Sequence, residues 1–165
     1  MRRGAVIGAT LLTATLAHAD DVPLCPDLSL RPAVPVTAAQ ESWPLVARNA
    51  FAADGTGEQY LHITLLLPVV RGDSPPCLAA YIVEDLRKSE TGEITGVIIP
   101  TSMDSPVFFN EAVAIDPARI VDWRYTPDIE GLRFGNYLLR QRFGDSEAAL
   151  LQSGLSPTPV PATWQ

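Results

Sequence analysis

Cysteine and histidine are scarce in this chain, so few residues have the chemistry of a nucleophile or a metal ligand. Cys25 and Cys77 are the only cysteines, and the only histidines are His18 and His62. Two cysteines in a chain that carries an export signal predict a disulfide, and oxidation would remove the thiolate that a nucleophile needs. A metal site would need more nitrogen and sulfur ligands. We therefore predict a Cys25–Cys77 disulfide, no metal site and no cofactor.

His62 lies in a segment whose alternation predicts a strand, with Tyr60, His62 and Thr64 on the less apolar face. No serine nucleophile elbow, catalytic cysteine or metal-binding helix accompanies it in the sequence. We interpret His62 as a solvent-facing or hydrogen-bonded structural residue, with catalysis as the alternative.

Basic residues concentrate in the C-terminal part of this acidic chain, at Arg133, Arg140 and Arg142. With Tyr137, they would be able to receive a carboxylate or an acidic partner surface. Internal charge balance with neighbouring acidic residues is the simpler interpretation.

The step Asp122-Trp123 also combines two residue types that suit a structural anchor or a binding site. A buried indole would anchor the sheet, and the carboxylate beside it would accept hydrogen bonds from backbone or arginine. We favour the structural role. The candidate binding residues are Asp122, Trp123, Arg133, Tyr137 and Arg140.

Acid pairs are the remaining candidates for catalysis, because two carboxylates cleave glycosidic bonds in many hydrolases. Such acids occur at Glu84-Asp85 and at Asp128 and Glu130. A hydrolase would need them to converge in a cleft with raised pKa values. The sequence gives no carboxylate separation, so enzymatic activity stays open, with the absence of activity favoured.

The N-terminus has the three parts of a secretory signal. Arg2 and Arg3 precede an apolar stretch from Ala5 to Leu16, and Ala17-His18-Ala19 is a small-x-small cleavage site. The stretch is shorter than the roughly 20 apolar residues that cross a bilayer. We predict cleavage after Ala19, a periplasmic or secreted location and no membrane association after cleavage.

The composition is acidic, with 19 acidic and 12 basic residues and a net charge of −7, which loss of the two leader arginines would change to −9. Nucleic acid and anionic lipid are poor partners for such a chain. A basic protein is a better electrostatic match, although the charge would also serve solubility alone. The sequence does not indicate an oligomeric state.

Proline marks both ends of the mature chain. We predict an extended lead-in over 20–36, a single domain over 37–154 and a loose proline-rich tail over 155–165. A helix is predicted from Trp43 to Ala53 with Pro44 in its first turn, because proline is tolerated there but not further inside a helix. A separate short turn is expected over 37–40.

The segments between these ends alternate in apolar character and are bounded by turn residues. The predicted strands are 59–70, 78–86, 94–99, 112–115 and 120–125. The second and third form a hairpin through 87–93. Residues 137–143 suit a strand or a helix, and a short helix is expected over 146–153, with Asp145 as N-cap and Gly154 after it.

The C-terminal half contains a glycine and proline strand, a tight turn at Asn110-Glu111, an Ile-x-Asp-Trp step and a glycine-rich ending. In this pattern it resembles the YegJ-like family, a bacterial domain family without an established enzymatic role. The matching residues are Gly96, Pro100, Val113, Ile120, Asp122, Trp123, Tyr125, Gly131, Gly135, Asn136, Tyr137 and Arg140. The family tends to have Gly-Asp at the turn, and the tryptophan of its Glu-x-x-Trp step is missing near Ala80 to Val83. The resemblance implies a fold and little chemistry.

These patterns together predict an α+β domain. A curved, mostly antiparallel sheet of five or six short strands would pack on one N-terminal helix, with a short helix near the C-terminus. A more closed small barrel with the helix as a plug is the alternative. We expect a non-catalytic periplasmic binding module, one concrete form being an immunity protein against a secreted toxin. The alternatives are a small envelope-acting hydrolase that uses carboxylates and a structural component of an envelope assembly.

Overall fold

The computed structural model of the chain describes residues 22–26, 34–70, 72–99, 111–128 and 131–165. The predicted signal segment 1–19, the predicted turn residue Asn110 and the acidic Glu130 lie outside the described residues. No helix within the described ranges is long and apolar enough to cross a membrane.

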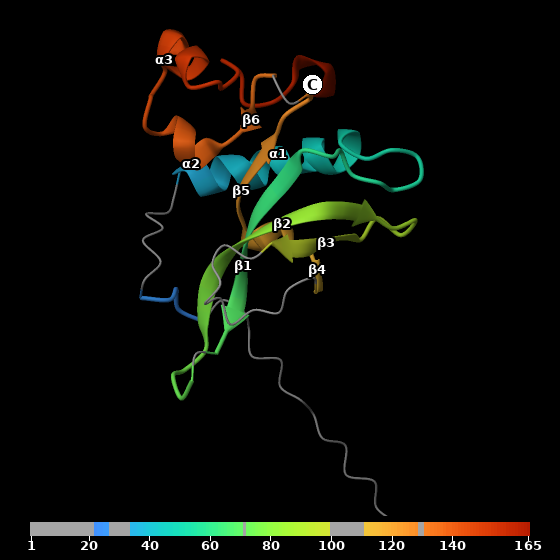
Figure 1. Cartoon of the computed structure of the whole chain (residues 1–165), viewed down its shortest axis with the longest axis vertical. Helices are drawn as coiled ribbons and strands as arrows, with labels where there is room; N and C mark the ends of the chain where they lie inside the picture. The colour runs from blue at the N-terminus through green and yellow to red at the C-terminus, as the bar shows by residue number, and fades with distance from the viewer. Residues whose placement is uncertain (1–21, 27–33, 71, 100–110, 129–130) are drawn as a thin grey trace, which may run out of the picture.

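Within these ranges, six strands form one sheet in the order β4-β3-β2-β1-β5-β6, and every neighbouring pair is antiparallel. The strands are β1 Leu61–Val69, β2 Cys77–Lys88, β3 Ile94–Ile99, β4 Ala112–Ala114, β5 Ile120–Tyr125 and β6 Phe134–Gly135. The end strands β4 and β6 do not pair with each other, so the sheet is open, and Figure 1 shows its curvature. The predicted α+β class with a curved sheet is confirmed, and the alternative of a closed barrel is wrong.

Helix α1 spans Val34–Asn49 and lies across β5 on one face of the sheet (Figure 1). The prediction of a helix that starts near Trp43 is wrong by about ten residues, and the expected turn at 37–40 belongs to this helix. Pro44 lies inside the helix but on its exposed side, where water can hydrate the carbonyl that loses its intrahelical donor. The opposite side buries Ala39, Trp43 and Val46, and this apolar contact outweighs the proline.

The hydrophobic core lies between α1 and the inner face of the sheet. Leu61, Ile63 and Leu65 alternate along β1 and are buried, as strand periodicity requires. The indole of Trp123 on β5 is also buried, and its Nε1–H donates to Ser42 Oγ of α1 at 3.0 Å. This bond fixes the helix against the sheet and satisfies the one polar atom of the indole.

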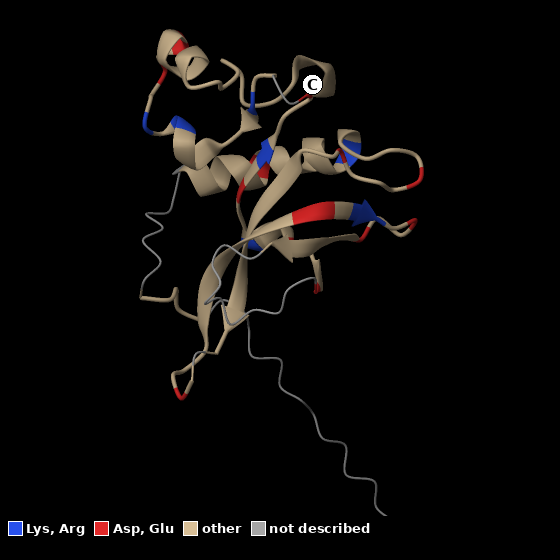
Figure 2. Cartoon of the chain, in the orientation of Figure 1, with Lys and Arg blue, Asp and Glu red and all other residues tan. Residues whose placement is uncertain are grey.

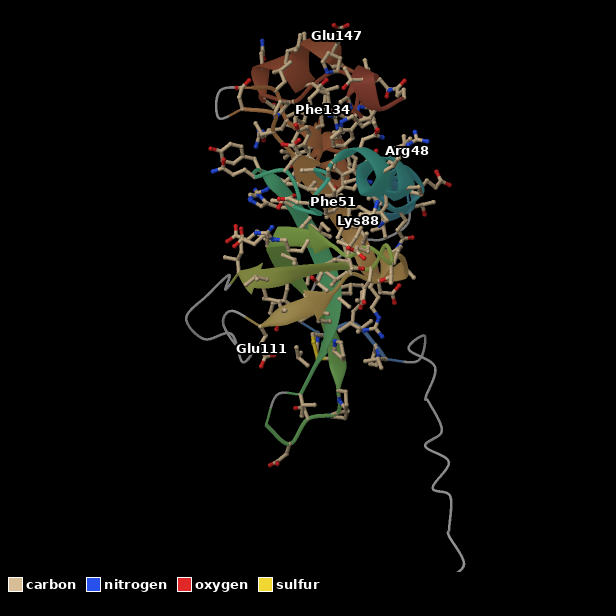
Figure 3. The ribbon with its side chains drawn as sticks, turned by 90° about the vertical axis from the view of Figure 1, so that its right-hand side faces the viewer. Arg48, Phe51, Lys88, Glu111, Phe134 and Glu147 are labelled. Atoms are coloured by element: carbon tan, nitrogen blue, oxygen red, sulfur yellow. A yellow bond between two sulfur atoms is a disulfide. The ribbon has the colours of Figure 1, made fainter. Side chains whose placement is uncertain are left out.

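The far end of α1 is fixed to β2 by a lysine. Lys88 Nζ donates to the carbonyl of Ala47 at 2.6 Å and lies 5.8 Å from the centroid of the Phe51 ring. Figure 3 shows Phe51 and Lys88 side by side. The helix ends at Asn49, before the predicted end at Ala53. A turn follows, in which Gly55 has φ +79°.

The C-terminal segment contains short helices: α2 Tyr137–Arg140, α3 Glu147–Gln152 and the 3-10 turn η3 Ala162–Trp164, whereas the 3-10 turn η2 Pro117–Arg119 precedes β5. Residues 137–143, left open by the sequence, therefore begin as a helix. Helix α3 is capped by Ser146 and not by Asp145 as predicted, because the hydroxyl of Ser146 accepts the hydrogen bond from Ala149 N–H.

The expectation of a loose proline-rich terminus is wrong. Val160 and Trp164 are buried, and the Trp164 ring stacks on Tyr125 with 4.9 Å between ring centroids. The backbone N–H of Gly135 donates to the carbonyl of Pro159 at 2.7 Å. Prolines lack a donor but keep their carbonyl acceptors, so this segment packs on the domain without forming a strand.

The predicted disulfide joins Cys25 to Cys77, the first residue of β2, with 4.9 Å between their Cα atoms. Backbone bonds accompany it: Cys25 N–H donates to the carbonyl of Leu78 at 2.9 Å, and Leu78 N–H donates to that of Pro23 at 2.8 Å. Residues 22–26 are therefore held against the start of β2, and the predicted Cys25–Cys77 disulfide is confirmed.

Candidate functional site

A row of three polar side chains crosses the outer face of the sheet, opposite to α1. His62 on β1 stands beside Arg124 on β5 in the strand register. Arg124 Nε–H donates to His62 Nδ1 at 2.7 Å, and His62 Nε2 lies 3.6 Å from Glu84 Oε2 on β2. In Figure 2 the ribbon of β1 carries no charged residue, whereas β2 carries residues of both signs.

Burial and the charge of Arg124 together determine the protonation of His62. Burial lowers the pKa of His62 below its usual 6.5, and the positive charge of Arg124 lowers it further, against a smaller opposite effect of Asp85. At neutral pH the imidazole is therefore neutral. Because Nδ1 accepts the bond from Arg124, the ring proton resides on Nε2.

This arrangement leaves His62 poorly suited to proton transfer. A general base needs an open lone pair, and that of His62 is occupied by the Arg124 donor. Nε2–H points toward the Glu84 carboxylate, and its 3.6 Å distance is longer than a hydrogen bond. His62 is thus a hydrogen-bonded residue of the sheet face, as the sequence predicted, and it orients the guanidinium of Arg124.

Two hollows adjoin the row and share His62 and Arg124. The first has a volume of about 110 Å³ and extends toward Thr64, Asp122 and Asn136. The second has a volume of about 160 Å³ and is lined by Tyr60, His62, Arg124, Thr126 and Arg133. Both are smaller than the several hundred Å³ typical of pockets that enclose a whole metabolite or cofactor. Each has room for a functional group at the end of a larger molecule.

Asp122, a candidate binding residue, has its carboxylate committed to the backbone. It accepts hydrogen bonds from the N–H groups of Trp123 at 2.8 Å, Tyr137 at 2.9 Å and Leu138 at 3.1 Å. It therefore caps the first turn of α2 from a neighbouring strand. Burial raises the pKa of Asp122, and the three backbone donors oppose that rise. The structural role favoured for Asp122 agrees with this geometry.

Two of the candidate arginines also donate to backbone carbonyls. Arg140 contacts the carbonyls of Ser156 at 2.7 Å and Thr158 at 3.3 Å, which fixes the C-terminal segment. Arg133 donates through Nε and Nη2 to the carbonyls of Gly154 and Ser153 at the end of α3. These hydrogen bonds go to carbonyls, and the charge of Arg140 also interacts with that of Asp122.

The five candidate residues do not line one common hollow. Asp122 and Trp123 border the first hollow and Arg133 borders the second. Tyr137 is half-buried, its ring meeting that of Trp123 edge-on at 5.9 Å. Burial raises the pKa of the Tyr137 hydroxyl. Tyr137 and Arg140 line neither hollow.

Arg124, the central residue of the site, was not among the candidates. A charged side chain between Trp123 and Tyr125 in a strand was the available signal, because it must stand on the exposed face. Its pairing with His62 follows only from the β1–β5 register, which joins segments about 60 residues apart. No group of three or more potential metal ligands occurs among the described residues.

Comparison of the chain with models of protein families, with curated proteins and with solved structures gives no match. The resemblance to the YegJ-like family stays a prediction that rests on the residues quoted for it.

Proposed function

We propose that this chain is an exported, non-catalytic binding module that recognises its partner through the outer face of the sheet at His62 and Arg124. The observation that carries the proposal is the Arg124–His62 hydrogen bond of 2.7 Å. It fixes an exposed guanidinium between two small hollows while it occupies the lone pair that a catalytic histidine would use. Such a site is arranged to bind a functional group of the partner and not to transfer a proton.

The positions of the acids support binding over the alternative of a carboxylate hydrolase. Among the residues that line the two hollows, Asp122 is the one carboxylate, and its oxygens accept three backbone donors. Glu84 faces His62, Asp85 is exposed but close enough to raise the pKa of His62 slightly, and Asp128 is exposed. A glycosidase mechanism needs two carboxyl groups on either side of one bond. In the lining of the two hollows, Asp122 has no second carboxyl group beside it.

Overall charge supports a basic protein as the partner. The chain has a net charge of −7, and removal of the predicted signal segment would make it more negative. Opposite net charges accelerate association between proteins and favour the correct encounter. An immunity protein that neutralises a toxin delivered to the periplasm fits these properties, and a secreted toxin encoded beside this chain would be the first partner to test.

The test compares capture of partners by two variants that lose the same charge. Arg124→Gln changes the proposed surface, and Arg142→Gln removes an exposed arginine in the turn that follows α2. The immobilised chain is exposed to periplasmic and culture fractions and to the neighbouring toxin, if one is encoded. We expect one basic protein to bind wild type and Arg142→Gln but not Arg124→Gln. Equal capture by all three chains would refute the proposed surface, and chemical conversion of a captured molecule would refute the non-catalytic role.

A further inference from the structure

We propose that the larger hollow, formed by Tyr60, His62, Arg124, Thr126 and Arg133, is a binding site for a carboxylate group carried by the partner. The inference rests on the proposed binding function and adds the chemistry of one contact. A carboxylate presents two coplanar oxygens, which match the paired N–H groups of a guanidinium.

The charged donors of this hollow are Arg124 on β5 and Arg133, which directly precedes β6. Arg124 uses Nε for His62, so its terminal nitrogens have no partner among the described residues. Arg133 uses Nε and Nη2 for the carbonyls at the end of α3, which leaves Nη1 without a bond to the described part of the chain. Both guanidinium groups are held in place by these bonds before a ligand arrives, which lowers the ordering cost of binding.

The lining of the hollow carries charge of one sign. Its five residues include two arginines, two hydroxyl side chains and the neutral His62, and no acid. The smaller hollow differs because Asp122 borders it, and a buried carboxylate there would repel a second one. Arg124 borders both hollows, so charge complementarity assigns an anionic group to the larger hollow alone.

The size of the hollow points to a group at the end of a side chain or peptide. A volume of about 160 Å³ is well above the space that one water molecule needs and below the usual range for a complete small-molecule ligand. The carboxylate of an acidic side chain or of a peptide C-terminus has this scale. A partner with a basic surface overall would then place one acidic residue against Arg124.

The experiment follows the arginine Nε–H signals of the ¹⁵N-labelled chain by NMR during titration with sodium acetate, at ionic strength kept constant with sodium chloride. We expect saturable shifts of the Arg124 and Arg133 signals. We also expect a rise in the pKa of His62, assigned with the His62→Gln variant, because a bound anion stabilises the imidazolium. The charged groups around His62 are Glu84, Asp85 and Arg124, together with Asp122 and Arg133 across the two hollows, and they are the same with and without acetate.

Variants separate a built site from general attraction of anions. In Arg124→Gln we expect acetate affinity to fall about tenfold or more, because a charge-assisted hydrogen bond is lost. Arg124→Lys keeps the charge but not the planar pair of donors, and we expect it to be weakened as well. Arg142→Gln is the matched control and should bind as wild type does. Equal affinity of Arg124→Gln and wild type, shifts that do not saturate, or tighter binding of sulfate than of acetate would overturn the proposal.

Short peptides distinguish the sources of the carboxylate. An acetylated, amidated peptide that ends in glutamate and an acetylated glycine peptide with a free C-terminus each offer one carboxylate, and a glutamine peptide amide offers none. Binding of either acid supports the site and identifies its source, whereas equal binding of the glutamine peptide refutes it. If partner capture depends on Arg124 but acetate does not bind, the carboxylate inference fails and the proposed function stands. If acetate binds but no partner is captured through this face, the hollow is a carboxylate site and the proposed function fails.

Discussion

Replacement of Trp164 by alanine should destabilise the whole domain, although the residue is the last but one in the chain. Trp164 is only 8% exposed, and its ring centroid lies 4.9 Å from that of Tyr125 and 6.4 Å from that of Trp123. Its carbonyl also accepts hydrogen bonds from Arg48 and Asn49 of α1. The ring therefore closes one end of the core between the helix and β5.

The expected loss follows from the cost of large-to-small substitutions. Removal of a buried tryptophan side chain costs about 3 to 5 kcal/mol, which already includes the lost aromatic contacts. A terminal segment can relax more easily than a strand, so we expect about 3 kcal/mol for Trp164→Ala. Typical domains are stable by roughly 5 to 15 kcal/mol, so the variant should still fold and be measurable.

Urea unfolding followed by far-UV circular dichroism measures this difference without relying on tryptophan fluorescence. Leu151→Ala is the matched control, because Leu151 lies in the same C-terminal segment but is 43% exposed. The control should change the free energy of unfolding by no more than about 0.5 kcal/mol. If Trp164→Ala changes the free energy of unfolding equally little, the Trp164 ring does not contribute to the core.

Three further perturbations test the contacts of other residues. Asp122→Asn should weaken the dependence of the free energy of unfolding on pH at acidic pH. The folded pKa of Asp122 is raised, so its contribution to stability is full below the unfolded value of 3.8 and is lost as pH rises through the folded pKa. Urea unfolding between pH 3 and pH 7 measures this difference. The His62→Gln variant should lose less stability than wild type on acidification from pH 8 to pH 5. The pKa of His62 is lowered in the folded state, so its contribution to stability is full above 6.5 and is lost as pH falls through the folded pKa. Parallel curves of unfolding free energy against pH for the two chains would contradict this. Reduction of the Cys25–Cys77 disulfide, which spans 52 positions, should cost about 4 kcal/mol in the chain-entropy model and expose the segment before α1 to protease first, and identical proteolysis with and without reductant would show that the bond has no such role.

The sheet was predictable because its signals are local. Alternation along β1 and the hairpin of β2 and β3 depend on neighbouring residues, and the structure has these strands within a few residues of the predicted ranges. The disulfide was predictable because two cysteines allow one pairing. These features need no knowledge of which distant segments meet.

The errors concern contacts between distant segments. Pro44 locally favours a helix start, but burial of Ala39 and Trp43 against the sheet extends α1 to Val34. The tail is rich in proline and lacks a periodic pattern, yet Arg140 holds its carbonyls and Trp164 completes the core. Tertiary contacts decide both the start of α1 and the packing of the tail, and a short stretch of sequence contains no information on such contacts.

In the candidate site, too, some residues were recognisable from the sequence, whereas the role of Arg124 follows only from the pairing of β1 with β5. Asp122 and Arg140 attract attention as charged residues of the C-terminal half, but their hydrogen bonds go to the backbone, so substitution of either would disturb the fold. Arg124 bonds to one side chain on an exposed sheet face, so its loss leaves the backbone bonds intact. Loss of binding in Arg124→Gln with unchanged unfolding would therefore report on recognition, whereas loss of binding in Arg140→Gln would report on folding as well. Arg124 is for this reason the residue at which binding and stability can be measured separately.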